Sequence, residues 1–408
     1  MSTCSTDFKL GDLADAADPY ATLATLRAQG SVIRSASSWL VLGHKEASEV
    51  LSSPNARSGF IGELYKSVLP PGAAREEMSH RINFMDAPAH PRIRKLIVKA
   101  FTPRRVETLR PYVADLSRKL LAPLDGDGEV DLILRFTHQV PSLVISELLG
   151  VPVEDREQLT EYADRVAGLL GLGSLTPEAM QEAVAAAEDM HGYLRKLLEE
   201  RRRKPGDDLI SGLLTVEDED RKLSESELMS LAATLYSAGH RTTRDLFSNG
   251  LSVLLANRPL VLEVANKKVS VEAAVEEFLR YETPTHYVVR MFCEPTEIGG
   301  VLINANEPVA VMIASANRDA AVYASPDTFD PYRWMADPAP PQPMSFALGP
   351  HFCLGANLAR LEAQEMLRAL IESYPTAELG AGPLKFWHTG LFRGLHALPV
   401  RLGPRSLR

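Results

Sequence analysis

The stretch Ser345-Phe-Ala-Leu-Gly-Pro-His-Phe-Cys-Leu-Gly355 runs directly into a helical pattern that begins at Ala356. Its cysteine, Cys353, lies between Gly349 and Gly355, just ahead of that helix. The amides and the dipole at a helix N-terminus favour a thiolate over a thiol. Glycines on both sides let the backbone pass close to a flat ligand. The segment therefore favours a thiolate beside a planar group, although a single loop cysteine, taken alone, is more often inert.

The composition is that of an ordinary folded protein, with 408 residues, 45% hydrophobic and 24% charged. A net charge of −9 argues against nucleic acid as the main partner. Three cysteines, Cys4, Cys293 and Cys353, leave one thiol unpaired in any disulfide scheme and indicate a reducing compartment. The polar N-terminus and the lack of a run of about 18 apolar residues predict neither a signal peptide nor a membrane span. We expect a cytoplasmic protein that binds neither nucleic acid nor membrane.

Hydrophobic periodicity predicts a mainly α fold with a small β part. Helical patterns begin at Pro88 and also fill residues 12–30, 45–51, 105–125, 131–150, 154–170, 177–203, 207–214, 224–257, 270–281 and 355–373. Strand patterns lie at 38–42 and within 286–313, a hairpin is expected at 383–402, and 218–221 form a charged loop. Residues 52–84 have an irregular pattern that allows a helical turn over residues 62–68. We expect a single large domain over residues 18–408 that follows an N-terminal tail over residues 1–17.

The pattern Phe-x-x-Gly-x-His-x-Cys-x-Gly over residues 346–355 resembles the haem-binding loop of the cytochrome P450 family. The resemblance implies that Cys353 is the metal ligand, a thiolate on the iron of haem b that helps to break the O–O bond. Many family members carry glycine where Ala347 stands. The length of the chain and Asp18-Pro-Tyr20 are similar to the bacterial soluble class. The implied fold is the mostly helical haem-thiolate fold.

Two further motifs that contain charged residues occur along the chain in the same order as in the family. Glu277-Phe-Leu-Arg280 places an acid and a base on one helix face, and Phe329-Asp-Pro-Tyr-Arg333 supplies a second arginine. Taken alone, Glu-x-x-Arg is most often a surface ion pair. The resemblance implies that Glu277, Arg280 and Arg333 form a structural triad behind the haem, with no catalytic role.

Four basic residues are expected to bind the haem propionates. His90 and Arg94, four residues apart, point the same way on one helix. A histidine and an arginine can hydrogen-bond and neutralise carboxylates. The resemblance adds Arg290 and His351 to the same set. The alternative is that these are solvated basic residues.

The segment Ala238-Gly-His-Arg-Thr-Thr243 lies in the long predicted helix. Glycine at a helix centre costs about 1 kcal/mol relative to alanine, so Gly239 indicates a close approach. In the family the approaching group is dioxygen, and the resemblance implies that the hydroxyl of Thr242 supports it. A threonine that bonds its own helix backbone is the alternative.

Arg241 stands where the family carries an acid that relays protons. Arginine cannot shuttle protons at neutral pH, so protons arrive by another route or are needed less. His240, which titrates near neutrality in its ordinary state, adjoins it. A buried cation needs a counter-charge, so we expect Arg241 to pair with Glu161, with Asp164 or with a substrate carboxylate. Thr242, Arg241 and His240 are the candidate catalytic residues.

The segment 88–106 is basic within an acidic chain. It holds no acid and carries Arg92, Arg94, Lys95, Lys99, Arg104 and Arg105. A solvated helix face is one explanation, and a docking surface for an acidic electron donor is the other.

The resemblance implies a monooxygenase that activates O₂ to hydroxylate or epoxidise a mid-sized, mostly apolar molecule in bacterial secondary metabolism. Electrons would come from NAD(P)H through a separate ferredoxin reductase and ferredoxin, since no nucleotide-binding glycine loop is visible. The expected pocket is mainly apolar with His286, Tyr287, His388 and Thr389 as polar anchors. The substrate is free or bound to a carrier protein, and we expect a monomer. Alternatives are non-hydroxylating chemistry (oxidative coupling, nitration, NO reduction or peroxide-driven oxidation) and a catalytically silent domain.

Overall fold

The computed structural model describes residues 5–125, 128–217 and 222–406, without the side chains of 172–174. Two compact units make up the chain. Unit 1 comprises Met1–Ala56, Arg110–Val140 and Thr242–Arg408, and unit 2 comprises Arg57–Leu109 and Pro141–Arg241. The expected charged loop at 218–221 and Cys4 lie outside the described residues.

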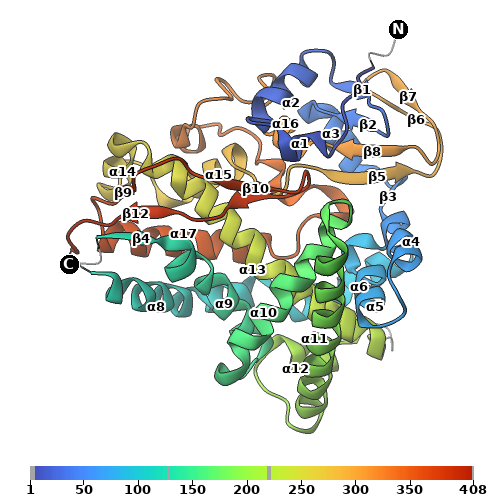
Figure 1. Ribbon diagram of the computed structural model, residues 1–408, viewed down its shortest axis with the longest axis horizontal. Helices are drawn as coiled ribbons and strands as arrows, with labels where there is room; N and C mark the ends of the chain where they lie inside the picture. The colour runs from blue at the N-terminus through green and yellow to red at the C-terminus, as the bar shows by residue number, and fades with distance from the viewer. Residues whose placement is uncertain (1–4, 126–127, 218–221, 407–408) are drawn as a thin grey trace. The chain divides into compact units, whose positions relative to one another are not determined.

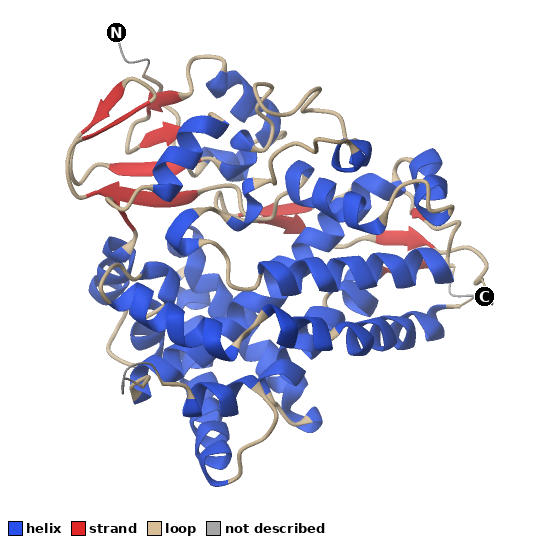
Figure 2. Cartoon of the chain, turned by 180° about the vertical axis from the view of Figure 1, so that it is seen from behind, coloured by secondary structure: helices blue, strands red, loops and turns tan. Residues whose placement is uncertain are grey.

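Helices dominate both units (Figures 1 and 2). In chain order they are α1 (Asp12–Asp15), α2 (Pro19–Arg27), α3 (His44–Ser52), α4 (Gly59–Val68), α5 (Ala73–Ser79), α6 (Ala89–Ala100), α7 (Pro103–Thr108), α8 (Arg110–Leu121), α9 (Gln139–Leu149), α10 (Arg156–Ala167), α11 (Pro177–Arg203), α12 (Leu209–Thr215), α13 (Glu225–Leu255), α14 (Arg258–Ala265), α15 (Val271–Tyr281), α16 (Ile313–Ala316) and α17 (Ala356–Ser373). Helix α13 begins in unit 2 and ends in unit 1.

The strands are short, and among the described residues they form four small sheets. They are β1 (Val32–Arg34), β2 (Trp39–Val41), β3 (Ala56–Arg57), β4 (Glu129–Asp131), β5 (Val288–Phe292), β6 (Thr296–Ile298), β7 (Val301–Ile303), β8 (Pro308–Val311), β9 (Glu378–Leu379), β10 (Phe386–His388), β11 (Arg393–Leu395) and β12 (Pro399–Arg401). The largest sheet has the order β1-β2-β8-β5-β3, and in it β2 and β8 run parallel. The expected C-terminal hairpin is the antiparallel pair β10–β11.

The largest sheet buries both of its faces in unit 1, which fits the period of two along a strand. Trp39 and Val41 belong to a core cluster that also contains Leu51 of α3 and Met344. Leu40 lies on the opposite face, in a cluster that contains residues of α2. Because Met344 begins the segment that leads to Cys353, the cysteine loop is anchored on the first cluster.

Several predicted elements are confirmed, and their ends have visible causes. Helix α11 has the predicted range 177–203, and its N-cap Thr176 accepts a hydrogen bond from the amide of Ala179 at 3.2 Å. The side chain of Asp18 caps α2 in the same way, accepting from the amide of Tyr20 at 2.9 Å.

Two predictions were incomplete. Residues 52–84 are less irregular than expected, since they contain α4 and α5, and the helical turn allowed over residues 62–68 is part of α4. Gly62 serves a close approach of these helices, because a Cβ there would lie 2.9 Å from the carbonyl oxygen of Ser79. Helix α14 follows the helix expected over 224–257 and was not predicted. Pro259 lies in the first turn of α14, with Asn257 as N-cap.

The division between an N-terminal tail and a domain at residue 18 stays a prediction. Leu13 of α1 is fully buried and packs with Tyr20 and Leu23 of α2. The amide of Thr6 donates to the carbonyl of Arg34 at 2.9 Å. Residues before 18 therefore contribute to the core of unit 1.

Candidate functional site

The cysteine loop is a set of tight turns in unit 1. The amide of Cys353 donates to the carbonyl of Phe346 at 2.9 Å, and the amide of Phe352 donates to that of Gly349 at 3.0 Å. The cysteine is exposed and lies three residues before the first residue of α17. A Cβ on Gly355 would lie 3.9 Å from its sulfur. The turns thus present the thiol at the start of a long helix, as expected.

Two residues of this loop have positive φ. Gly349 has φ +67°, and a Cβ there would lie 2.3 Å from the carbonyl oxygen of Leu51, so only glycine fits. Ala347 has φ +56° and ψ −165°, a region that is essentially restricted to glycine and costs about 1–3 kcal/mol for other residues. The structure therefore gives the physical reason for the family glycine at this position. Ala347 partly offsets the cost because it packs on the core cluster of Met344.

The predicted structural triad is confirmed. The carboxylate of Glu277 accepts from Nε and Nη2 of Arg280 at 2.8 and 2.7 Å, and neither side chain is exposed. Nε of Arg333 lies 3.3 Å from the same carboxylate. Trp334 Nε1 and the amide of Asp330 also donate to it, at 2.9 and 2.7 Å. The last two partners were not predicted.

The four expected propionate contacts are divided between the units. In unit 1, Arg290 is 6% exposed and lies on β5, while His351 is half-buried in the cysteine loop. In unit 2, His90 is 4% exposed and Arg94 half-buried, both on α6. Their role as propionate ligands stays a prediction.

Gly239 has a packing reason that the sequence did not show. A Cβ there would lie 3.2 Å from Cγ1 and Cδ1 of Ile145 on α9, tighter than ordinary van der Waals contact. Within unit 2, the group that comes close to Gly239 is the side chain of Ile145, so the glycine lets α9 pack closely on α13. Its role beside the cofactor stays a prediction.

His240 is an ion-pair partner that the sequence analysis did not assign. Its ring is 1% exposed, with Nε2 3.0 Å from Oδ1 of Asp164 and Nδ1 3.1 Å from the carbonyl oxygen of Tyr236. The ring of His240 thus joins α13 to the carboxylate of Asp164 on α10.

The two acids expected beside Arg241 have other partners in unit 2. Asp164 pairs with His240, and Glu161 pairs with Arg165 on its own helix. Arg241 and Thr242 are half-buried on α13. The pairing of Arg241 and the catalytic roles of Arg241, Thr242 and His240 stay predictions.

Three of the expected polar anchors, His286, His388 and Thr389, form hydrogen bonds within unit 1. His286 has no exposed surface, and its Nδ1 lies 3.0 Å from Nε2 of His388. Oγ1 of Thr389 accepts from the amide of Phe392 at 3.1 Å. His286 thus does not offer its side chain to a ligand, because it is buried in the contact between β5 and the β10–β11 hairpin.

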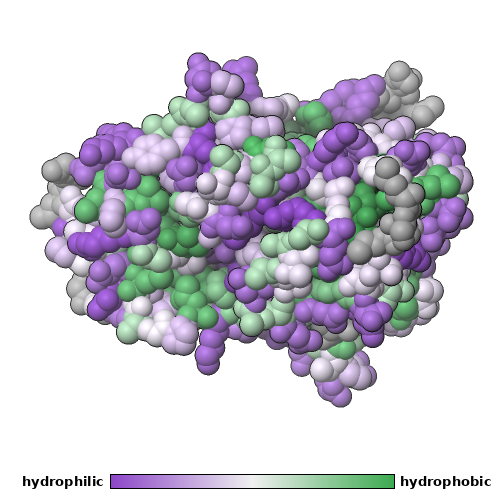
Figure 3. Space-filling view, turned by 90° about the horizontal axis from the view of Figure 1, so that it is seen from above, coloured by the Kyte–Doolittle hydropathy of each residue, from purple (hydrophilic) through white to green (hydrophobic). Residues whose placement is uncertain are grey.

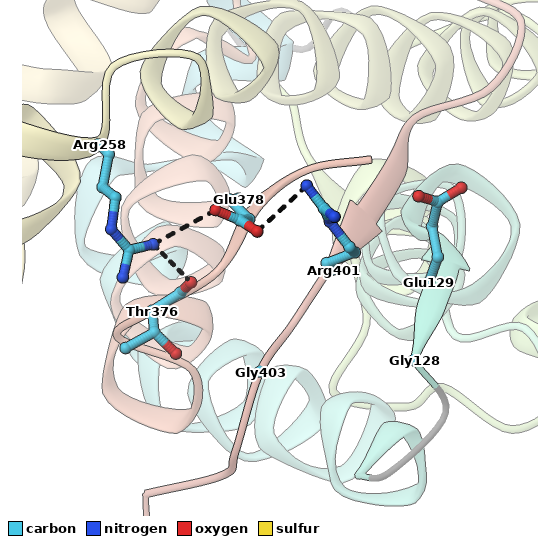
Figure 4. Close-up of a pocket in the computed structure, with 7 residues that line it drawn as sticks. All are labelled: Gly128, Glu129, Arg258, Thr376, Glu378, Arg401 and Gly403. Carbon is cyan, nitrogen blue, oxygen red and sulfur yellow. Dashed lines mark hydrogen bonds and ion pairs between the residues drawn. The ribbon is translucent and has the colours of Figure 1, made fainter. Parts of the chain in front are cut away.

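A surface pocket at one end of unit 1 has no part in this chemistry (Figure 4). Nη1 of Arg258 and Nη2 of Arg401 lie 3.4 and 3.2 Å from the carboxylate of Glu378, and no residue of the cysteine loop lines the pocket. Both arginines are more than half exposed. We interpret it as a solvated ion-pair cluster.

Known proteins share this arrangement over nearly the whole chain. Residues 266–385 match the family model described as Cytochrome P450. The chain is 37% identical to the cytochrome P450 monooxygenase PikC of Streptomyces venezuelae, over 95% of this chain and 91% of that protein. It is 35% identical to the vitamin D(3) 25-hydroxylase of Pseudonocardia autotrophica, over 95% of both. The chain belongs to the cytochrome P450 family.

The solved structures agree on the fold. The P450BioI structure, in complex with an acyl carrier protein carrying hexadec-9Z-enoic acid, has a TM-score of 0.84 and 32% sequence identity, covering 96% of this chain and 99% of that one. This P450 therefore has one copy of the haem-thiolate fold, mainly α with small sheets.

The residues fit the family cofactor, haem b. No group of three or more His, Cys, Asp or Glu that could hold a metal occurs among the described residues. A single exposed thiol suits an iron whose porphyrin supplies four ligands. Cys293 and Cys353 form no disulfide within the part of the chain that the structure describes. As a P450 monooxygenase, the enzyme uses O₂ and electrons from external redox partners.

Hydrophilic side chains cover much of the face shown in Figure 3, with apolar ones gathered in patches between them. Within residues 5–125, 128–217 and 222–406, no helix is long and apolar enough to cross a membrane.

Proposed function

We propose that this P450 hydroxylates or epoxidises a mid-sized, mostly apolar intermediate of bacterial secondary metabolism, with NAD(P)H, a ferredoxin reductase and a ferredoxin as the electron chain. The observation that carries the proposal is the thiol of Cys353, presented at the start of α17 by a loop of the haem-binding pattern. The cysteine usage supports a reducing, cytoplasmic location, and we propose a monomer.

Four apolar residues support the substrate class. Val288, Val289, Leu391 and Phe392 are half-buried in unit 1, so parts of these side chains remain accessible. The relatives that resemble the chain include, by their names, a vitamin D(3) hydroxylase and a 6-deoxyerythronolide B hydroxylase. A carrier-bound acyl chain is a further form of the substrate, because P450BioI was solved with such a partner.

The chain's own residues have separate tasks in the proposed reaction. Haem bound to Cys353 supplies the activation of dioxygen. His90, Arg94, Arg290 and His351 would hold the propionates by charge-assisted hydrogen bonds. The Thr242 hydroxyl would hold a proton beside the oxygen site, and Arg241, which cannot release one at neutral pH, leaves its delivery to water or substrate.

The proposed ferredoxin site is the basic surface of α6 and the turn after it. Lys95, Lys99 and Arg104 are exposed there. Arg92 forms an ion pair with Glu227, which neutralises its charge. The proposed docking surface is the basic segment as a whole, since opposite potentials steer an acidic donor.

Non-hydroxylating chemistry is the second candidate, and Arg241 favours it. The guanidinium of Arg241 stands on α13 where the family has an acid, next in sequence to His240. An altered supply of protons favours a different outcome of oxygen or peroxide chemistry.

The test begins with the haem spectrum. The reduced carbon monoxide complex of the wild type should show the red-shifted Soret band of a thiolate ligand. Cys353→Ala should lose this band, and Cys293→Ala should keep it. Retention of the band in Cys353→Ala would contradict the proposal.

Turnover separates the two chemistries. Macrolides, steroids, vitamin D₃ and fatty acyl carrier proteins would be screened by the spin-state shift of the haem. Hits would then be incubated with ferredoxin, reductase and NADPH, or with peroxide alone. A product with one added oxygen in the first mixture supports hydroxylation or epoxidation. A coupled, nitrated or peroxide-only product supports the second candidate.

A further inference from the structure

Two histidines that the proposed reaction does not use lie side by side in unit 1. His286 lies two residues before β5, and His388 ends β10. Nε2 of His388 is 3.0 Å from Nδ1 of His286, and their rings meet edge to face with centroids 4.6 Å apart. His286 is fully buried, whereas His388 is half-buried.

The hydrogen bonds determine which ring nitrogens carry protons. The amide of Gly390 donates to Nδ1 of His388 at 2.9 Å, so this nitrogen is an acceptor without a proton. The proton of His388 is then on Nε2, which donates to Nδ1 of His286. His286 therefore carries its own proton on Nε2, a buried atom with no hydrogen-bond partner.

The surroundings oppose a second proton on either ring. Burial, followed by the charges of His388, Arg393 and Arg318, lowers the pKa of His286 well below its ordinary value. Burial and the charge of Arg393 lower the pKa of His388 to about 4. Glu282 is the neighbouring acid, but it pairs with both arginines and accepts from Tyr20. Both histidines are thus neutral at physiological pH.

The pair joins two segments whose backbones are also linked. The amide of His286 donates to the carbonyl of Leu391 at 2.8 Å, and the amide of Arg393 donates to that of Pro284 at 2.9 Å. Thr285 and Phe392 form an isolated β-bridge. The segment before β5 and the turn of the β10–β11 hairpin are therefore joined by backbone hydrogen bonds and also by the hydrogen bond between the two imidazoles.

We propose that His286 and His388 are positioning residues for substrate specificity, a hydrogen-bonded pair that holds Leu391 and Phe392 against the segment before β5 as a rigid wall for an apolar part of the substrate. The proposal rests on the proposed function, because it takes these two side chains to face the substrate. Sequence resemblance alone assigned the histidines as polar anchors, which is the opposite role.

The protonation states can be measured without any substrate. Holoenzyme labelled with ¹⁵N-histidine, in its diamagnetic ferrous carbon monoxide form, would be recorded by NMR from about pH 5 to pH 8. The signals lost in His286→Gln and His388→Gln identify the pair. Both should show the Nε2–H tautomer at every pH. A second proton on either ring within this range would overturn the proposal.

Two substitutions at residue 388 separate its two hydrogen bonds. Asparagine places an acceptor near the position of Nδ1 and keeps the bond from Gly390, but it does not reach His286. Glutamine places a donor near the position of Nε2 and keeps the bond to His286. His396, exposed just beyond the same hairpin, provides the control His396→Asn.

Imidazole and 4-phenylimidazole serve as probes, because both bind the haem iron and only the second carries a ring that reaches a pocket wall. His388→Asn should weaken 4-phenylimidazole about tenfold, the scale of a lost pocket contact, and leave imidazole within about twofold. His388→Gln and His396→Asn should bind both probes as the wild type does. Equal weakening of both probes by His388→Asn, or none, would overturn the proposal. A wild type that binds neither probe through its iron would instead contradict the proposed function.

Discussion

Nε2 of His240 lies 3.0 Å from Oδ1 of Asp164, and this ion pair connects α13 to α10. One turn earlier on both helices, the hydroxyls of Tyr236 and Thr160 lie 2.9 Å apart. The two contacts are four residues apart on each helix, so they form a polar seam with two rungs. The seam stabilises α10 on the helix that carries Arg241.

Asp164→Asn should weaken this seam. The substitution replaces the carboxylate partner of the buried His240 ring, and because Asp164 is about one-third exposed we expect a loss of about 1–2 kcal/mol rather than the full cost of a buried pair. Urea unfolding of the holoenzyme would measure it. Glu161→Gln, one turn away in an exposed pair with Arg165, should cost less than about 0.5 kcal/mol. Equal losses in the two variants would contradict a stabilising role for the contact between His240 and Asp164.

Ala347→Gly should stabilise the cysteine loop. Glycine adopts φ +56° and ψ −165° without strain, so relief of about 1–2 kcal/mol should exceed the lost packing of one methyl group. We expect a higher urea midpoint for loss of the thiolate-type carbon monoxide spectrum. Ala359→Gly, within α17, should act in the opposite direction by about 1 kcal/mol. A lower midpoint in Ala347→Gly would show that the methyl contact matters more than the strain.

Glu277→Gln should prevent stable haem incorporation. Loss of the carboxylate leaves Arg280 fully buried without its charge partner, at a cost of about 3–5 kcal/mol. The haem content of the purified protein would measure the effect. Glu276→Gln is the matched control, because its pair with Arg360 is partly exposed, and it should keep its haem. Wild-type haem content and stability in Glu277→Gln would be incompatible with a structural triad.

Reversing the charge of Lys95 and Lys99 should slow reduction by ferredoxin. The double variant Lys95→Glu with Lys99→Glu should reduce the rate about tenfold at low salt, with the difference shrinking as ionic strength rises. Stopped-flow measurement of the ferrous carbon monoxide complex reports the rate. Reversal of Arg195 and Lys196, two exposed cations on α11, should have little effect. Similar losses in both double variants would indicate a general charge effect and no docking site on α6.

The neutral histidine pair should make stability depend on pH. The folded-state pKa of His388 is lowered to about 4, whereas the unfolded chain titrates near pH 6.5, so the unfolded state binds more protons between these values. The contribution of His388 is therefore fully present above about pH 6.5 and decreases as the pH falls toward 4. Urea midpoints at pH 7 and 4.5 should differ less in His388→Asn than in the wild type. An unchanged difference would mean that His388 titrates alike in both states.

Local sequence patterns were enough for much of this protein. The range of α11 and the loop that contains Cys353 depend on residues close in the chain, through capping, periodicity and turn geometry. Glu277, Arg280 and Arg333 were also assigned correctly, because two of them share a helix face and the third follows in family order. The full length of α4 was not predicted, and the packing role of Gly62 appears only when α5 lies against that helix.

The pairings of the buried ionisable groups could not be obtained this way. The sequence by itself determined the family and the helical fold, since these depend on short-range patterns and on the order of motifs. Only the tertiary structure decided that Asp164 serves His240, that His286 and His388 face each other, and that Ala347 has a glycine conformation. The physical reason is that a hydrogen bond or an ion pair depends on distances of about 3 Å between atoms. Residues 76 positions apart, such as Asp164 and His240, reach that distance only after their helices have packed.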